Sequence, residues 1–193
     1  MLTTRIYPNV SSDVKGTEFT LDSLKFNSGF LSAVAGDTTL MKQDFADRYF
    51  QNTMQSAKQR AEQQYKLDNE AWIKQNATKE GVKTTESGLQ YKVITAGKGT
   101  VASKDDEVTV KYEGRTIDGN VFDSSYKRTP DTTTFRPNQV IKGWTEALVH
   151  MPAGSVWEVY IPQQLAYGER EQGQIKPFSV LIFKIELISV GGK

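Results

Sequence analysis

The chain has 193 residues, of which 37% are hydrophobic and 24% are charged, a composition typical of a soluble globular protein. Its 24 basic and 23 acidic residues leave a formal net charge of +1, so we expect no general attraction to nucleic acid or to an anionic membrane. The absence of cysteine excludes disulfides, thiolate metal sites and cysteine nucleophiles, and one histidine cannot build an all-histidine zinc site. We therefore expect neither a metal nor a cofactor.

The sequence also bears on the membrane and on the compartment. No window approaches the roughly 18 uninterrupted apolar residues that a membrane-spanning helix needs. The first residues, MLTTRIYPNVSSDVKG, lack the continuous apolar core of a secretory signal. Two locations stay open: the cytoplasm, or the periplasm or cell envelope if a signal has been removed.

The N-terminal part of the chain is predicted to be helical. Residues 1 to about 20 show no periodic pattern, whereas residues 22–35 carry an N-cap at Asp22 and apolar residues on one face, with Gly36 to end the helix. A second helix is predicted from about Thr38 to Gly81, since neither proline nor glycine interrupts it. At 1.5 Å per residue it would be about 60 Å long.

The middle of this long helix is polar on almost every side. Between residues 55 and 72 its apolar stripe consists only of Ala57, Ala61, Tyr65 and Trp72. A helix of this kind is usually a solvated spacer or one partner of a pair, and we interpret it as a solvated stalk. Because so thin a stripe cannot cover the phenylalanine and methionine faces of the N-terminal helices, self-association is expected.

After Gly81 the pattern becomes that of β-strands. Alternating or continuous apolar runs predict strands over residues 89–95, 108–117, 156–161 and 178–190, and a single short helix is predicted over residues 143–149. Asp118 and Gly119 stand between apolar runs, which indicates a hairpin with a type I′ turn. These elements predict an α+β domain in which an antiparallel β-sheet is wrapped around one short helix.

No common nucleotide-binding or hydrolytic motif occurs in the sequence: GxGxxG, GxxxxGK[ST], HExxH and GxSxG are all absent. Aromatic residues instead stand beside turns and glycines, as Tyr112, Phe122, Trp144 and Tyr167 do. Aromatic residues in strands are usually part of the core. Their position at strand ends favours a second interpretation, an apolar pocket with a few polar groups.

Four segments in order carry a resemblance: VKYEGRTIDGNVFDSS, TFRPNQVIKGWTEAL, MPAGSVWEVYIPQQLAYG and VLIFKIELISV. Together they resemble FKBP-type peptidyl-prolyl cis-trans isomerases. The upstream segments LDSLKFNSGFLSAVAG and EGVKTTESGLQYKVI resemble the N-terminal dimerisation region of the bacterial macrophage-infectivity-potentiator-like branch. The resemblance implies a helical dimerisation region over residues 1–83 with a long connecting helix, an isomerase domain over residues 84–193, and a homodimer.

The resemblance also implies roles for individual residues. The indole of Trp144 would form the floor under a proline ring, and the Tyr167 hydroxyl and the Ile141 backbone N–H would each serve a substrate carbonyl. The catalytic residues so implied are Asp123, Tyr167, Phe122 and Trp144. The substrate-binding residues so implied are Tyr112, Phe135, Val140, Ile141, Ile175 and Phe183. Arg128 would pair with Asp123, and the loop over residues 168–174, which is more charged than in many relatives, would contact the residue before proline.

The chemistry implied by this resemblance needs no proton transfer. Rotation about an Xaa-Pro amide has a barrier of about 20 kcal/mol because it disrupts resonance, and a site lowers the barrier by binding the twisted amide better than either planar form. His150, the one histidine, is therefore interpreted as a solvated or capping residue. Expected partners are proline-containing unfolded or nascent polypeptides and macrolide inhibitors. The alternative function is a chaperone-like dimeric binding module with weak or no isomerase activity.

Overall fold

The computed structural model describes residues 31–32, 35 and 43–191. The helix predicted over residues 22–35 lies largely outside the described residues, and so does the predicted start of the long helix near Thr38. The chain divides into two compact units, Met1–Gln64 and Tyr65–Lys193.

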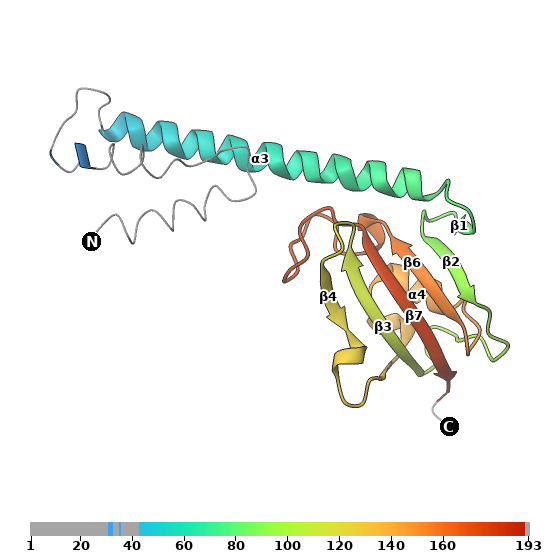
Figure 1. The fold of residues 1–193 in the computed structure, drawn as a ribbon. Coiled ribbons are helices and arrows are strands. Elements are labelled where there is room, and N and C mark those ends of the chain that lie inside the picture. The colour runs from blue at the N-terminus through green and yellow to red at the C-terminus, as the bar shows by residue number, and fades with distance from the viewer. Residues whose placement is uncertain (1–30, 33–34, 36–42, 192–193) are drawn as a thin grey trace. The chain divides into compact units, whose positions relative to one another are not determined.

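One long helix precedes a mainly β structure (Figure 1). The helices are α3 (Gln43–Asn76) and α4 (Lys142–Leu148). The strands are β1 (Val82–Thr84), β2 (Gln90–Thr95), β3 (Val108–Thr116), β4 (Val121–Ser124), β5 (Thr133–Phe135), β6 (Val156–Ile161) and β7 (Leu181–Val190). Short 3-10 helices cover Ser125–Lys127, Pro137–Gln139 and Gln163–Leu165. The α+β class predicted from the sequence is confirmed.

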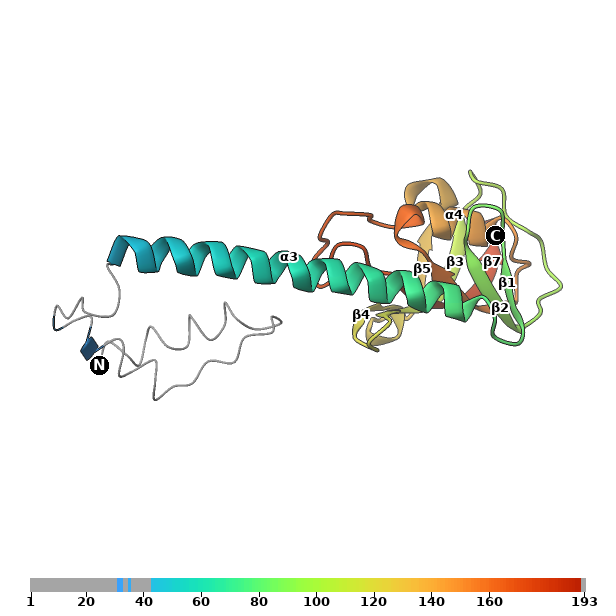
Figure 2. The same ribbon diagram turned by 90° about the horizontal axis from the view of Figure 1, so that it is seen from above.

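All seven strands belong to one antiparallel sheet, in the order β1-β2-β6-β7-β3-β4 with β5 paired to β3. Helix α4 lies against one face of this sheet (Figures 1 and 2). Its buried side chains Trp144, Ala147 and Leu148 join the inward residues of the strands in one hydrophobic core. The alternation of buried and half-buried residues along β3 is the pattern expected of a strand with one face on a core.

The long helix ends at Asn76, five residues before the predicted end at Gly81. The backbone N–H of Thr78 bonds to the carbonyl of Gln75, a tighter hydrogen bond than the α-helical one, and the Thr78 hydroxyl donates to the same carbonyl. The residues that follow turn into β1, where the chain pairs with β2. The prediction that the helix continues as far as proline and glycine are absent therefore made the helix too long.

Residues 65–76 of α3 belong to the second unit, and they are not a solvated stalk. The Trp72 ring lies 5.8 Å from the Tyr160 ring of β6, between centroids. The buried Asn76 amide donates to the side-chain oxygen of Gln90 on β2, and the Gln90 amide donates to the carbonyl of Ile73. The stalk interpretation is wrong for this stretch because one aromatic contact and buried polar side chains attach it to the sheet without a wide apolar stripe.

The predicted hairpin between β3 and β4 forms, but its turn is not type I′. A type I′ turn needs a positive φ at both central residues. Among the described residues Gly119 has φ 83°, whereas Asp118 does not have a positive φ. The N–H of Thr116 bonds to the carbonyl of Asn120, and the Asp118 carboxylate accepts from the Thr116 hydroxyl. These contacts produce a three-residue loop with glycine in the left-handed position.

The predicted boundary between residues 83 and 84 stays a prediction. It falls within β1, and the compact unit that contains the sheet begins at Tyr65. Among the residues that the structure describes, no helix has both the length and the apolar character needed to cross a membrane.

Gly143 allows α4 to approach the sheet, and its substitution tests that packing. A Cβ at this position would lie 2.4 Å from Cγ2 of the buried Ile161 on β6. We expect Gly143→Ala to lower the free energy of unfolding by about 1–3 kcal/mol through overpacking, as measured by urea denaturation. Lys142→Ala is the control, because Lys142 is exposed in the same turn and should change stability by less than about 0.5 kcal/mol. Equal stability of the two variants would contradict close packing at Gly143.

Candidate functional site

A cavity of about 850 Å³ lies between α4, the ends of several strands and the loop that precedes β7. Its lining residues are Tyr112, Phe122, Asp123, Thr133, Phe135, Gln139, Val140, Ile141, Trp144, Tyr167, Gln172, Gly173, Gln174, Ile175 and Phe183. All ten residues that the resemblance names as catalytic or substrate-binding are in this set, whereas Arg128 is not. The structure brings them together, and their catalytic and binding roles stay predictions.

The Trp144 indole lies at the centre of an aromatic group. Its side chain comes from the first turn of α4 and is only 5% exposed. Three rings approach it edge to face, with centroid distances of 5.2 Å to Tyr112, 5.1 Å to Phe183 and 5.7 Å to Phe135. Edge-to-face packing places the positive edge of one aromatic ring against the negative face of another, which is favourable. This arrangement therefore fixes the orientation of the indole.

Gly114 on β3 makes room for another aromatic pair in the lining. Phe122 on β4 and Phe183 on β7 meet edge to face at 5.5 Å on either side of β3. A Cβ at Gly114 would lie 2.5 Å from Phe183 and 2.8 Å from Phe122. A glycine is therefore required where the two rings converge over the strand.

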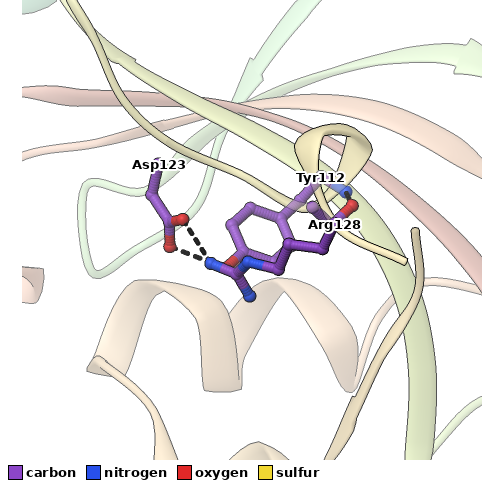
Figure 3. Close-up of polar contacts among 4 residues, drawn as sticks. Tyr112, Asp123 and Arg128 are labelled. Atoms are coloured by element: carbon purple, nitrogen blue, oxygen red, sulfur yellow. Dashed lines mark hydrogen bonds and ion pairs between the residues drawn. The ribbon is translucent and has the colours of Figure 1, made fainter. Parts of the chain in front are cut away.

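Tyr112, Asp123 and Arg128 form a polar cluster (Figure 3), and the first two of them line the cavity. The Tyr112 hydroxyl donates to Oδ2 of Asp123 at 2.6 Å, and Nη2 of Arg128 donates to Oδ1 of the same carboxylate at 2.5 Å. Arg128 also lies 3.3 Å from the Tyr112 hydroxyl oxygen. The suggested pairing of Arg128 with Asp123 is thus present in the structure, and the guanidinium balances the carboxylate charge.

Two tyrosines of the cavity are held in the protonated form. Burial raises the pKa of Tyr112, and the hydrogen bond to Asp123 raises this pKa further. Burial, together with the charge of Asp123, also raises the pKa of Tyr167. Both phenols are therefore donors at neutral pH. The Tyr112 hydroxyl already donates to Asp123. The Tyr167 hydroxyl has no hydrogen-bond partner in the described part of the chain.

Five lining residues were given no individual role from the sequence: Thr133, Gln139, Gln172, Gly173 and Gln174. The last three lie in the loop over residues 168–174, which was expected to contact the residue before proline. The same three belong to a small hairpin at residues 172–175, which is closed by reciprocal backbone hydrogen bonds between Gln172 and Ile175. The left-handed Gly173, with φ 58°, sits in its turn. The glycine between two glutamines is the one sequence signal that could have indicated this turn.

His150 does not line the cavity. Its ring Nδ1 lies 2.7 Å from the backbone carbonyl of Glu146, and its side chain is exposed at the end of α4. This geometry agrees with the capping interpretation. Within the described residues, no group of three or more histidine, aspartate or glutamate side chains could hold a metal ion.

Comparison with known proteins places this geometry in a family. The model of the FKBP-type peptidyl-prolyl cis-trans isomerase domain matches residues 98–188, and the model of the domain amino-terminal to it matches residues 7–93. The crystal structure of FkpA from Escherichia coli superposes with a TM-score of 0.80 at 33% sequence identity, covering 98% of this chain and 91% of that one. The chain belongs to the family of FKBP-type peptidyl-prolyl cis-trans isomerases.

Two curated FKBP-type relatives each match somewhat less than two thirds of the chain. The peptidyl-prolyl cis-trans isomerase Mip of Coxiella burnetii is 56% identical over 124 residues, which are 64% of this chain and 54% of the relative. The FKBP-type 22 kDa peptidyl-prolyl cis-trans isomerase of Escherichia coli is 52% identical over 120 residues, 62% of this chain and 58% of the relative. The match thus spans little more than half the length of these relatives.

The raised pKa of Tyr112 generates a prediction about stability in alkali. Above about pH 10, the ordinary pKa of a tyrosine, the unfolded chain loses a proton that folded Tyr112 retains. The contribution of Tyr112 to stability is therefore complete below that pH and declines as the pH rises toward the raised folded pKa. We expect the free energy of unfolding of Tyr112→Phe to fall less steeply than that of the wild type between about pH 9 and about pH 11. Urea denaturation across this range checks the slope, and parallel slopes would contradict it.

Proposed function

We propose that this FKBP-type chain accelerates cis-trans isomerisation of Xaa-Pro bonds in polypeptides. The observation that carries the proposal is the aromatic cavity with the buried Trp144 indole at its centre. At about 850 Å³ the cavity is within the size range of ligand-binding pockets, and its side chains are mainly apolar. A proline ring is apolar and compact, so it fits a surface made of ring edges and faces.

The catalytic step would be non-covalent. A twisted Xaa-Pro amide has lost its resonance and carries less charge on its carbonyl oxygen, so it tolerates a water-poor site better than the planar amide does. Two donors are available to hold the peptide. The Tyr167 hydroxyl is protonated and has no partner in the described part of the chain, and the Ile141 N–H stands at the N-cap of α4.

The cluster of Tyr112, Asp123 and Arg128 would act by its position rather than by proton transfer. Its carboxylate is already engaged on both oxygens, by the Tyr112 hydroxyl and by the guanidinium. A balanced ion pair at the wall presents a fixed dipole to the rotating amide without an uncompensated charge. We therefore assign to Asp123 the orientation of the Tyr112 ring, which in turn packs against Trp144.

A second function, a dimeric module that binds proline-containing unfolded chains, is supported by the N-terminal match. Residues 7–93 fit the domain that precedes FKBP-type isomerase domains, and FkpA from Escherichia coli is similar over nearly the whole chain. We propose that residues 1–83 mediate a homodimer and that polypeptides are the substrates. Macrolide inhibitors would compete with them for the same cavity.

The isomerase proposal is tested at opposite ends of α4. Trp144→Leu removes the aromatic floor, and we expect it to lower kcat/KM for a short Xaa-Pro peptide by about tenfold or more, a loss of at least about 1.4 kcal/mol of transition-state binding. His150→Ala is the control and should stay within about twofold, because a change below about 0.4 kcal/mol is expected where no substrate contact exists. A protease-coupled isomerisation assay on the full chain measures both.

Two results would contradict this assignment. A folded wild-type chain without acceleration would overturn the isomerase function and leave the binding module. A folded His150→Ala chain without activity would mean that proton transfer, rather than an apolar floor, carries the reaction.

The oligomeric state is tested separately. We expect sedimentation equilibrium of the full chain to give the mass of two chains, because the apolar faces that the sequence predicts for the N-terminal helices would be covered by a second copy. The mass of a single chain across the measured concentrations would exclude the dimer without affecting the isomerase proposal.

A further inference from the structure

The hairpin at residues 172–175 forms one wall of the cavity, and all four of its residues contribute to the lining. Reciprocal hydrogen bonds between the backbones of Gln172 and Ile175 close the hairpin, and Ile175 is buried. Residues 176–180 then connect it directly to β7. The position of this wall therefore depends on how that connection is held.

The connection contains a strained residue. Phe178 has φ 64°, the one positive φ found at a residue other than glycine in the described chain. A side chain in the left-handed region is energetically unfavourable, so other contacts must stabilise the conformation. The Phe178 N–H bonds to the carbonyl of Gly168 at 2.7 Å and closes the neck of the loop. Nζ of Lys66, on α3, lies 4.8 Å from the centre of the Phe178 ring.

Two hydrogen bonds link the same connection to α3. The Tyr65 hydroxyl lies 2.9 Å from the hydroxyl oxygen of Ser179. The backbone N–H of Val180 donates to Oδ1 of Asn69 at 2.8 Å, and the Asn69 amide donates to the carbonyl of Tyr65. The helix thereby contacts three consecutive residues of the connection, Phe178, Ser179 and Val180.

Both residues of the hydrogen bond between Val180 and Asn69 are buried. Asn69 is 1% exposed and Val180 is 2% exposed, so water does not replace the bond when it is lost. Removing the acceptor would leave a buried backbone N–H without a partner, which is energetically unfavourable. The chain can avoid that cost by moving the connection outward, and with it the hairpin.

We propose that Tyr65, Lys66 and Asn69 are positioning residues, through which α3 holds the hairpin at residues 172–175 against the cavity and thereby sets the affinity for the peptide. This inference rests on the proposed isomerase function for its kinetic consequence. Its structural part, the dependence of the hairpin on the helix, can be measured without activity. None of the three helix residues lines the cavity itself.

The test compares Asn69→Leu with the wild type in the full chain. If Asn69→Leu makes the hairpin's position beside the cavity less favourable by about 1 kcal/mol, the equilibrium between the hairpin in place and displaced changes about fivefold. We therefore expect KM for the peptide to rise about fivefold. We expect kcat to stay within about twofold, because the Trp144 floor is not touched by the change. Asn69→Asp retains the acceptor oxygen for Val180 but loses the donor to the Tyr65 carbonyl and buries a carboxyl group, so we expect its KM to lie between those of the wild type and Asn69→Leu.

Asn76→Leu is the matched control. Asn76 is the other fully buried asparagine of α3, with the same 1% exposure, but its amide bonds to Gln90 on β2 instead of the connection. We expect it to lower stability without raising KM. Tyr65→Phe, which deletes one hydroxyl, provides a milder variant in case Asn69→Leu does not fold; it should raise KM by about twofold.

Hydrogen exchange of the Ile175 amide supplies the readout that does not need activity. This N–H is bonded inside the hairpin to Gln172, and we expect it to exchange at least about fivefold faster in Asn69→Leu than in the wild type, but not in Asn76→Leu. An unchanged exchange rate together with an unchanged KM in folded Asn69→Leu and Tyr65→Phe would overturn the inference while the isomerase function stands. If the wild type lacked isomerase activity, the exchange rate alone would decide the positioning role.

Discussion

The packing of the Trp144 indole against three other rings is the contact on which the cavity depends. Trp144 comes from α4, whereas Tyr112, Phe183 and Phe135 come from β3, β7 and β5. The edge-to-face geometry joins these elements at one point, so the helix cannot rotate without separating several aromatic pairs. The same aromatic contacts that complete the core therefore also form a rigid apolar surface in the cavity. The candidate site is therefore the exposed end of the core rather than a separate addition to it.

Shape alone would not distinguish this cavity from a hydrophobic gap, and the polar groups at its wall make the difference. Asp123 is fixed by Tyr112 and Arg128, and its charge in turn helps to keep Tyr167 protonated. The wall consequently offers a donor next to an apolar floor, with no free charge facing it. That combination suits an amide whose carbonyl loses charge as it twists, and it suits poorly a reaction that develops an oxyanion.

Much of the β structure could be predicted because its constraints are local. Alternating burial along β3 and the apolar run of β7 are visible as periodicity, and the aromatic residues at strand ends marked the neighbourhood of the cavity. The turn at Gly119 was placed correctly but assigned the wrong type, since the contacts of Asp118 that select the turn are not visible as a pattern. Thr133 and Gln139 were missed altogether, and the loop with Gln172, Gly173 and Gln174 was expected at the site without a role for any one residue. Hydrophobic periodicity carries no information about which polar residues face inward.

The end of α3 was misjudged for the same physical reason, and it shows how a polar helix can be docked. Its attachment to the sheet uses two buried asparagines, Asn69 and Asn76, which bond to a backbone N–H and to a glutamine side chain. A backbone N–H just before β7 needs a partner as much as any within the sheet, and Asn69 supplies it from 111 residues away. Such bonds contribute modestly to stability but are expensive to break when buried. They therefore fix the position of residues 65–76 of α3 more strictly than an apolar stripe of the same length would. The loop beside the cavity is bonded to this part of the helix, so its position is fixed as well.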